Sequence, residues 1–262
     1  MTGALISLVL LAVMFVPLER AFAARPQSVW RPRFGTDLMF FVGQQLLFVP
    51  ATTMVLLWVA WPLRSLPLLG LREGYLGLPW GVQAVIAVLL GDVLTYWGHR
   101  AAHRIPVLWR FHRVHHSARQ LDWMAAWREH PLDGLYTMTT ANLPALILGV
   151  PMGGLAALAA FRGLWGVFLH SNVVLRLGPL GMVVGSPHHH HWHHDEGIGG
   201  QRNFANHLPV LDWIFGTLHH PPGEPERLGV KGHELGSYLG SMVEPLAGSG
   251  RPRPHSAPAE VG

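Results

Sequence analysis

Long apolar runs separated by short polar segments fill most of the chain before residue 100. The runs 3–18, 38–61 and 80–97 approach or exceed the length that a helix needs to cross a bilayer, about 20 residues. Because lipid cannot satisfy a side-chain amide, Gln44 and Gln45 in the second run are expected to face other helices. The pattern predicts three membrane helices.

Two further apolar segments, 134–149 and 152–170, follow a polar stretch and are separated by Gly149, Val150 and Pro151. Each is short for a full crossing, and the break between them predicts a helical hairpin that packs against the other helices. The four-residue spacing of Gly153 and Ala157 permits close helix contact. The sequence leaves open whether this pair crosses the bilayer or only enters it.

The N-terminal apolar run could be either a cleaved signal peptide or a membrane helix. The sequence Ala21-Phe22-Ala23 resembles a signal-peptidase site, but the preceding run lacks a positively charged start, and Glu19 and Arg20 separate it from the site. We therefore expect a retained helix. Residues 1–246 are predicted to form one membrane domain. Residues 247–262 show no apolar pattern and are predicted to be a disordered tail.

Composition supports a membrane protein. Half of the 262 residues are hydrophobic and only 13% are charged, against about 25% in soluble domains. The chain has no cysteine, which excludes disulfides, zinc–thiolate sites and cysteine nucleophiles. The net charge of +4 comes with no nucleic-acid-binding motif, so nucleic acid is not expected as a partner.

The arginine distribution predicts the orientation in the membrane. Four arginines follow the first run, which places that loop on the cytoplasmic side: Arg20, Arg25, Arg31 and Arg33. The loop 62–79 holds only Arg64 and Arg72 among basic residues and is expected on the opposite side. The region from His99 onward then begins in the cytoplasm.

Histidines recur at helical spacing. Three boxes follow one another along the chain: His99 and His103; His112, His115 and His116; His190, His193 and His194, the last within SPHHHHWHHDE. Spacings of three and four place the rings of each box on one helix face. One such pair alone is more often a set of surface or core histidines, but three in order favour a metal site.

The number and chemistry of these histidines predict two metal ions. Neutral imidazole suits zinc, copper, iron and nickel. Eight box histidines exceed the capacity of one tetrahedral ion. The carboxylate-rich Glu-x-x-His pattern of soluble di-iron bundles is not prominent, so the predicted ligand set is almost entirely nitrogen.

Six motifs in order resemble the fatty acid hydroxylase/sterol desaturase superfamily: DVLTYWGHRAAHR, WRFHRVHHS, REHPLD, FLHSN, SPHHHHWHH and NFANHLPVLDWIFGT. The resemblance covers about residues 88–218. It implies an all-α, polytopic membrane bundle with a cytoplasmic, helical, histidine-rich cap that holds a non-haem di-iron site, in which zinc can replace iron on overexpression. The implied activity is O₂-dependent hydroxylation or desaturation of a lipid C–H bond, and the motifs do not decide between the two.

Carried over by position, the resemblance makes the eight box histidines metal ligands and adds His170. Some relatives have another histidine one turn earlier, where this chain has Gly166, so His130 is the remaining candidate for a tenth ligand. Three histidines lie off the register of the third box and are not expected to be ligands: His188, His189 and His191.

Weaker candidates surround this set. Asp92, two helical turns before His99, either orients a ligand imidazole or caps a helix near the membrane surface. Asn203 and Asp212 match the family pattern and are expected to hold the C-terminal region against the site. The remaining histidines are expected at the surface: His207, His219, His220, His233 and His255. Four tryptophans either line a lipid entrance or anchor the interface: Trp109, Trp123, Trp127 and Trp192.

Oxidation of an unactivated C–H bond requires a redox metal, because side-chain acids and bases cannot perform it. No haem, flavin or dinucleotide fingerprint appears in the chain, so an external ferredoxin- or cytochrome-type donor with its reductase is expected. A membrane metal transporter or buffer is the alternative from another class, but it would place polar ligands along the spans. A protein that uses metal only for stability would not need so many ligands.

Overall fold

Regular secondary structure is entirely helical in the part of the chain that this computed structural model describes, residues 2–63, 66–175, 177–232 and 237–247. The α-helices are α1 Thr2–Ala21, α2 Phe34–Gly43, α3 Val49–Leu63, α4 Leu69–Leu76, α5 Trp80–Arg104, α6 Pro106–His116, α7 Pro131–Ile147, α8 Met152–His170, α9 Pro187–His193, α10 Val210–Ile214 and α11 Tyr238–Val243. Short 3₁₀ turns lie at η2 Ala125–Trp127, η3 Gly178–Met182 and η4 Ile198–Gln201, and η1 Gln44–Phe48 is π-helical. The predicted all-α class is confirmed.

Among the described residues, four helical segments are long and apolar enough to cross a membrane: Thr2–Ala21, Phe34–Trp58, Trp80–Arg104 and Met152–His170. The first and third contain the predicted runs 3–18 and 80–97, and the second covers the predicted run 38–61 as far as residue 58. The fourth is the second arm of the predicted hairpin, whose turn contains Gly149 at φ 78°. Of the predicted tail, residues from 248 onward lie outside the described residues.

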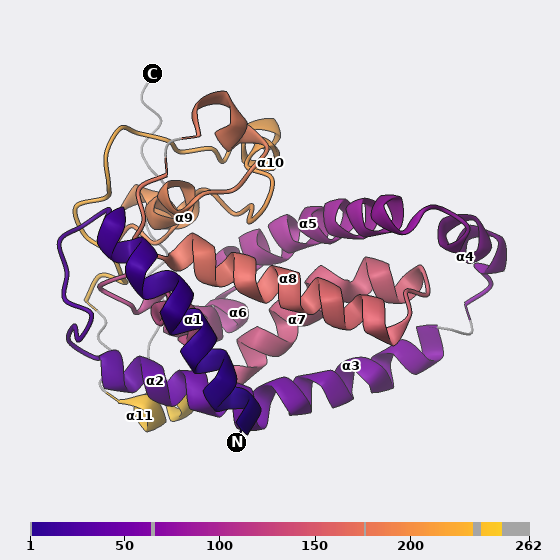
Figure 1. Ribbon diagram of the computed structural model, residues 1–262, viewed down its shortest axis with the longest axis horizontal. Coiled ribbons are helices and arrows are strands. Elements are labelled where there is room, and N and C mark those ends of the chain that lie inside the picture. The colour runs from indigo at the N-terminus through magenta and orange to yellow at the C-terminus, as the bar shows by residue number, and fades with distance from the viewer. Residues whose placement is uncertain (1, 64–65, 176, 233–236, 248–262) are drawn as a thin grey trace.

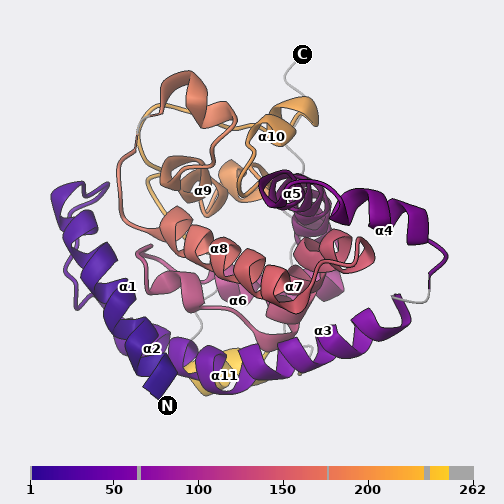
Figure 2. The same ribbon diagram turned by 45° about the vertical axis from the view of Figure 1, so that its right-hand side comes forward.

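The site-bearing helix ends gather at one end of the bundle. Helices α3, α5, α7 and α8 run beside one another, with α4 at one end and α9 and α10 at the other (Figures 1 and 2). Helix α5 packs most extensively against α7. Helices α5, α6 and α8 each end in or beside a histidine motif, so their C-terminal turns meet α9 at the same end.

The first histidine box lies on the last turns of helix α5, beyond the end of its apolar run. The helix continues to Arg104, beyond the apolar run that ends near Trp97, and its 25 residues extend about 37 Å. Close packing requires small residues along it. A Cβ on Gly91 would lie 2.5 Å from the carbonyl oxygen of Ala141 in α7, and a Cβ on Gly98 would lie 3.1 Å from Thr140. Helix α7 is therefore held against the side of α5 that leads to the site.

The π-helical turn between α2 and α3 lies within the second apolar run. Gln44 is buried there, and its side-chain amide donates to the Glu129 carbonyl at 3.3 Å. Gln45 is only half-buried. The expectation that these amides face protein is thus confirmed for Gln44, which joins the membrane helix to the segment before α7.

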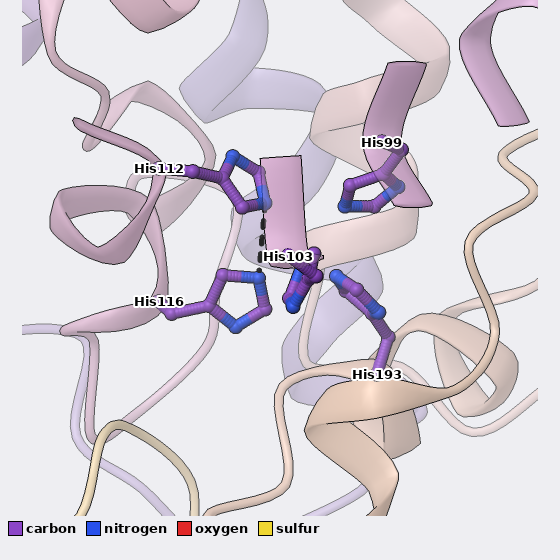
Figure 3. Close-up of side chains that lie close together, drawn as sticks. All are labelled: His99, His103, His112, His116 and His193. Carbon is purple, nitrogen blue, oxygen red and sulfur yellow. Dashed lines mark hydrogen bonds between the residues drawn. The ribbon is translucent and has the colours of Figure 1, made fainter. Parts of the chain in front are cut away.

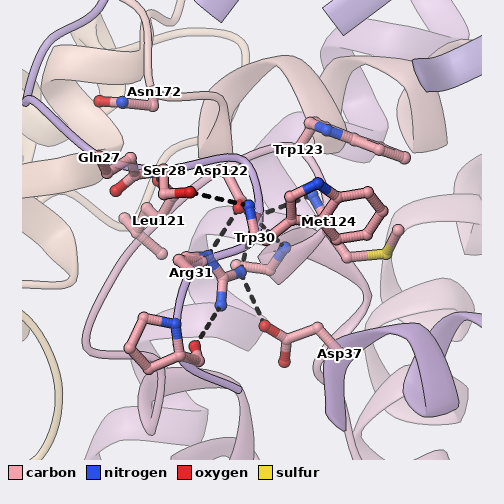
Figure 4. A network of polar contacts seen from close by, with 12 residues as sticks. Gln27, Ser28, Trp30, Arg31, Asp37, Leu121, Asp122, Trp123, Met124 and Asn172 are labelled. Atoms are coloured by element: carbon pink, nitrogen blue, oxygen red, sulfur yellow. Dashed lines mark hydrogen bonds and ion pairs between the residues drawn. The ribbon is translucent and has the colours of Figure 1, made fainter. Parts of the chain in front are cut away.

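A buried network of four charges joins segments far apart in the sequence, and Figure 4 shows three of them, Arg31, Asp37 and Asp122. The guanidinium of Arg31 forms a bidentate pair with Asp122, at 2.6 Å for both contacts, and contacts Asp37 at 2.7 Å. Arg128 contacts the other oxygen of Asp37 at 2.6 Å. All four side chains are at most 4% exposed. Two cations and two anions balance, so the polar loops can be buried without an unpaired charge.

This network also reaches the histidine region. The backbone carbonyl of Arg128 lies 3.2 Å from Nδ1 of His115. Asp122 orders its own turn by accepting hydrogen bonds from the backbone amides of Met124 and Ala125. The segment 122–128 is thereby fixed between α2 and the second histidine box.

Replacing Arg31 with Met should destabilise the protein strongly, because it leaves Asp37 and Asp122 buried with too little positive charge. Breaking a buried ion pair costs about 3–5 kcal/mol, which corresponds to a fall in Tm of roughly 6 °C or more for a chain of this size. Thermal unfolding of the detergent-solubilised protein would measure it. Arg20→Met, at an exposed position, is the control and should shift Tm little. Equal shifts for both variants would contradict the role given to the network.

Candidate metal centre

Nine histidines form two buried or nearly buried groups. The first comprises five residues from α5, α6 and α9: His99, His103, His112, His116 and His193 (Figure 3). The second comprises four from α6, α8 and α9: His115, His170, His190 and His194. In each group, one nitrogen from every ring lies within 4.8 Å of the corresponding nitrogens of the others.

Helical periodicity distributes two of the boxes between both groups. In α6, His112 and His116 belong to the first group, while His115 belongs to the second. The third box is divided the other way, since His193 joins the first group, and His190 and His194 join the second. The rings of His116 and His194 stack at a centroid distance of 4.3 Å, so the groups adjoin. Two metal ions bound here would be neighbours.

Spacing between ring nitrogens matches the edges of a coordination polyhedron. In the second group, the Nε2 of His170 lies 3.1 Å from that of His115 and 3.1 Å from that of His190. The Nε2 atoms of His112 and His116 in the first group are 3.2 Å apart. A metal–nitrogen distance of about 2.1 Å gives edges of about 3.0 Å in an octahedron and about 3.4 Å in a tetrahedron. The observed values lie between these.

Protein acceptors orient five of the nine rings through Nδ1. His99 and His193 face the carbonyls of Phe204 and Arg202, both at 2.8 Å. His170 faces the Gly166 carbonyl one turn earlier at 2.7 Å, and His115 faces that of Arg128. His112 faces a carboxylate, Oδ2 of Asp133, at 2.9 Å. With the proton on Nδ1, the Nε2 lone pair is directed into the group, as metal-binding histidines require.

The residues present fit metal ions on two counts. The Nε2 atoms of His99, His103 and His193 are buried and have no hydrogen-bond partner in the protein. Buried polar atoms are rarely left unsatisfied, and a bound cation would satisfy these three. The donor set is also entirely imidazole, which suits iron, zinc, copper or nickel and not magnesium or calcium.

Burial keeps these imidazoles neutral. Loss of hydration lowers the pKa of His116, His193 and His194 well below the usual value, and repulsion among neighbouring histidines lowers it further. The same causes lower the pKa of His115 and His190. The rings can therefore offer lone pairs at neutral pH without first losing a proton, which favours metal binding.

The structure places His130 outside both groups. It caps α7, with Nδ1 accepting from the backbone amide of Leu132 at 3.1 Å and Nε2 facing the Met242 carbonyl at 3.2 Å. Both ring nitrogens are thus already engaged. The residue of the motif REHPLD that contacts a histidine group is instead Asp133, through His112; sequence reasoning missed it although it lay within a motif singled out for His130.

Two of the off-register histidines of SPHHHHWHH connect α9 to the C-terminal region. His189 pairs with Asp212 at 3.1 Å, and His191 pairs with Glu224 at 2.6 Å. Asp212 also accepts from the backbone amides of Phe204 and Ala205. Asn203, at φ 57°, donates to the carbonyls of His189 and His219. The positions of Asn203 and Asp212 agree with the holding role expected of them.

Asp92 and His207 differ from their expected positions. Asp92 does not contact His99; its Oδ1 lies 2.7 Å from Nδ1 of His207. The expectation of a surface His207 is wrong, since the residue is 9% exposed. His219 is half-buried and His220 is exposed, while His233 and His255 lie outside the described residues.

The tryptophans divide between core and site. Trp123 is buried in the core cluster that includes Phe41, so its expected place at an entrance or interface is wrong. Trp127 is half-buried and meets Phe41 edge to face. Trp109 lies beside the first group, with its ring 5.0 Å from that of His103 and 5.5 Å from that of His116. Trp192 donates to the Gly223 carbonyl.

Known proteins share this histidine-bearing region. The model of the family described as fatty acid hydroxylase matches residues 84–217. An ornithine lipid hydroxylase of Rhizobium tropici is 31% identical over 66% of this chain and 53% of its own. Human alkylglycerol monooxygenase is 32% identical over 60% of this chain and 38% of its own. A Delta(7)-sterol-C5(6)-desaturase of Nicotiana tabacum is 24% identical over 56% of this chain and 53% of its own.

This chain spans about half the length, or less, of these three relatives. No solved structure matches it. The family match covers more than half of the chain and includes all nine histidines of the two groups. The chain belongs to the fatty acid hydroxylase family.

Proposed function

We propose that this protein is an integral membrane di-iron oxygenase that hydroxylates a C–H bond of a lipid, with O₂ as oxidant and electrons from an external donor. The observation that carries the proposal is the pair of adjoining, all-histidine groups at the end of apolar helices. Its metal ligands are the nine histidines described above, with His130 left out because both its ring nitrogens are engaged.

Each group would hold one iron ion. Bound iron supplies the redox chemistry that couples O₂ and two electrons to oxidation of a lipid C–H bond, which amino-acid side chains cannot perform. The protein contributes geometry: Asp133 and the backbone carbonyls hold the imidazoles in place. Aromatic side chains such as Trp109 and Phe204 pack against the first group and exclude water from it.

A lipid substrate follows from the position of the site. The first group includes the last turns of α5, a helix capable of crossing the membrane, so a lipid can reach it laterally from the bilayer. The relatives include proteins named as lipid hydroxylase, alkylglycerol monooxygenase and sterol desaturase. Two of these names denote oxygen insertion, which favours hydroxylation over desaturation for this chain.

Metal analysis should find about two transition-metal ions per chain, iron in the native membrane and zinc in part after overexpression. His193→Ala should lower occupancy of the first group, and His115→Ala should lower occupancy of the second. Each variant should therefore retain about one ion, and the double variant should retain neither. Elemental analysis of purified protein measures the content.

The matched control is His220→Ala, at an exposed position outside both groups. It should retain both ions. Full metal content in the double variant, or an equal loss in the control, would contradict the assignment of ligands.

The reaction can be tested in membranes supplied with ¹⁸O₂, a lipid panel and either a ferredoxin or a cytochrome donor with its reductase. We expect ¹⁸O in a product hydroxyl only when a donor is present, and none with His115→Ala. Loss of two hydrogens without label would show desaturation. Absence of any oxidised lipid, together with altered metal uptake by cells, would favour a metal transporter instead.

We further propose a multi-pass topology with the histidine groups on the cytoplasmic side, because the arginine-rich segment 19–33 lies at the same end of the molecule. Single cysteines are clean probes, since the chain has none. A cysteine at exposed Glu226 should react with an impermeant reagent only from the cytoplasm, and one at exposed Glu73 only from the other side. The reverse pattern would overturn this orientation.

A further inference from the structure

A second polar cluster lies between α5, α8 and the loop before α10, and no metal ligand belongs to it. It consists of Asp92, Arg162, Trp165 and His207. The side chains of Asp92 and His207 are 1% and 10% exposed. Asp92, Arg162 and Trp165 stand on helices capable of crossing the membrane. Ionisable residues in such positions are costly and usually have a function.

The imidazole of His207 is held in place by Asp92 and by two aromatic rings. Its Nδ1 donates to Oδ1 of Asp92 at 2.7 Å, and the backbone amide of His207 reaches the same oxygen at 3.4 Å. Two rings of α8 stack against its imidazole, those of Phe161 and Trp165, at centroid distances of 5.3 and 5.4 Å. Phe161 is 42% exposed on the apolar surface. The cluster therefore lies close to where surrounding lipid would be.

Three polar atoms in this cluster are buried without a hydrogen-bond partner in the protein. They are Oδ2 of Asp92, Nε2 of His207 and Nε1 of Trp165. Lipid tails cannot satisfy such atoms. They belong to side chains that contact one another through the central imidazole, which indicates one site and not three isolated defects.

The chemistry of these atoms specifies a ligand. Because Nδ1 of His207 donates to Asp92, its Nε2 is an acceptor, as is the free carboxylate oxygen. The indole of Trp165 is a donor. Arg162 lies close enough to Asp92 to interact electrostatically and is itself held by Asn142 at 2.9 Å, so it can balance the carboxylate charge. Acceptors beside a donor suit a secondary amide or a hydroxyl group.

Two segments of the chain connect this polar cluster to the first histidine group, and each constrains the distance between them. Asp92 precedes His99 by seven residues of α5, an axial distance of about 10 Å. On the facing loop, the Phe204 carbonyl contacts His99, and His207, three residues later, contacts Asp92. Three residues span at most about 10 Å, in agreement with this distance. The cluster thus lies about 10 Å from the first group, toward the middle of the membrane.

We propose that Asp92 and His207 accept a hydrogen bond from the amide N–H or hydroxyl of a lipid's linkage region while Trp165 donates one to its carbonyl or hydroxyl oxygen, and that these contacts set which carbon reaches the metals. Since the linkage is held deeper in the membrane than the metals, the oxidised carbon lies on its head-group side and not within the acyl tail. This inference rests on the proposed function and narrows its substrate to polar lipids with such a linkage.

The test uses two long-chain probes that differ in one group, N-methylhexadecanamide and methyl hexadecanoate. The amide has an N–H where the ester has an oxygen. Dissociation constants follow from the stabilisation of the metal-loaded, detergent-solubilised protein against heat. The wild type should bind the amide about tenfold more tightly, the value of one buried hydrogen bond. A preference below about twofold in the wild type would overturn the proposal.

His207→Gln should reduce the amide preference to about threefold or less, with metal content unchanged. Trp165→Phe should weaken the binding of both probes alike, because its N–H donates to the carbonyl that the two probes share. Their controls are Trp58→Phe, at a tryptophan 78% exposed on α3, and His220→Gln. Both should keep the wild-type preference. An unchanged amide preference in His207→Gln, or an equal loss in its control, contradicts the site. If His207→Gln fails to fold, Trp165→Phe decides the matter, and binding of both probes as tight as in Trp58→Phe contradicts the site.

Turnover separates this inference from the reaction itself. With an oxidisable lipid in hand, Trp165→Phe should spread ¹⁸O over neighbouring carbons, whereas Trp58→Phe should keep one position. If no lipid is oxidised but the amide preference depends on His207, the proposed reaction fails and the binding site stands. If lipid is oxidised without any amide preference, the binding site fails and the reaction stands.

Discussion

Nine imidazole rings occupy one largely buried volume, which favours their neutral form and the approach of a cation to their lone pairs. Protonation of one ring would place a buried positive charge beside eight other imidazole rings. Loss of hydration, followed by repulsion from neighbouring histidines, therefore lowers the pKa of residues such as His116 and His194. Bound metal would reverse this electrostatic balance, because it supplies the positive charge toward which the lone pairs point. The surrounding structure correspondingly offers acceptors, backbone carbonyls and Asp133, to the outward nitrogens.

The need to place those rings explains features distant from them. Gly91 and Gly98 let α7 approach α5, which brings Asp133 to His112. The balanced charges of Arg31, Asp37, Asp122 and Arg128 fix the segment whose carbonyl faces His115. Breaking that network would therefore disturb the second histidine group as well as stability. The off-register histidines His189 and His191 similarly tie α9 to the C-terminal region.

Local periodicity explains which parts of the structure could be predicted. Apolar runs located the membrane helices, and spacings of three and four identified the box histidines, because both depend only on the pitch of a helix. The division of α6 and α9 between two groups, and the partnership of Asp92 with His207 across 115 positions, depend on how distant segments pack. No local pattern contains that information. His207 looked like a surface residue because its partner lies on another element.

Burial of charge was the other feature that the sequence concealed. Arg31 was counted only as a charge of a cytoplasmic loop, where most arginines are exposed, yet it is 4% exposed and paired with Asp37 and Asp122. Trp123 was expected near an interface and is instead part of the core. In both cases the residue is buried by elements far away in the sequence, which its local surroundings do not show.

The most direct test is anomalous scattering from crystals of the iron-loaded protein, measured on both sides of the iron absorption edge. The account predicts two iron peaks, one among the five histidines that include His99 and His193, and one among the four that include His115 and His170. A single peak shared by all nine rings, or peaks at His130 or at the surface histidine His220, would contradict it.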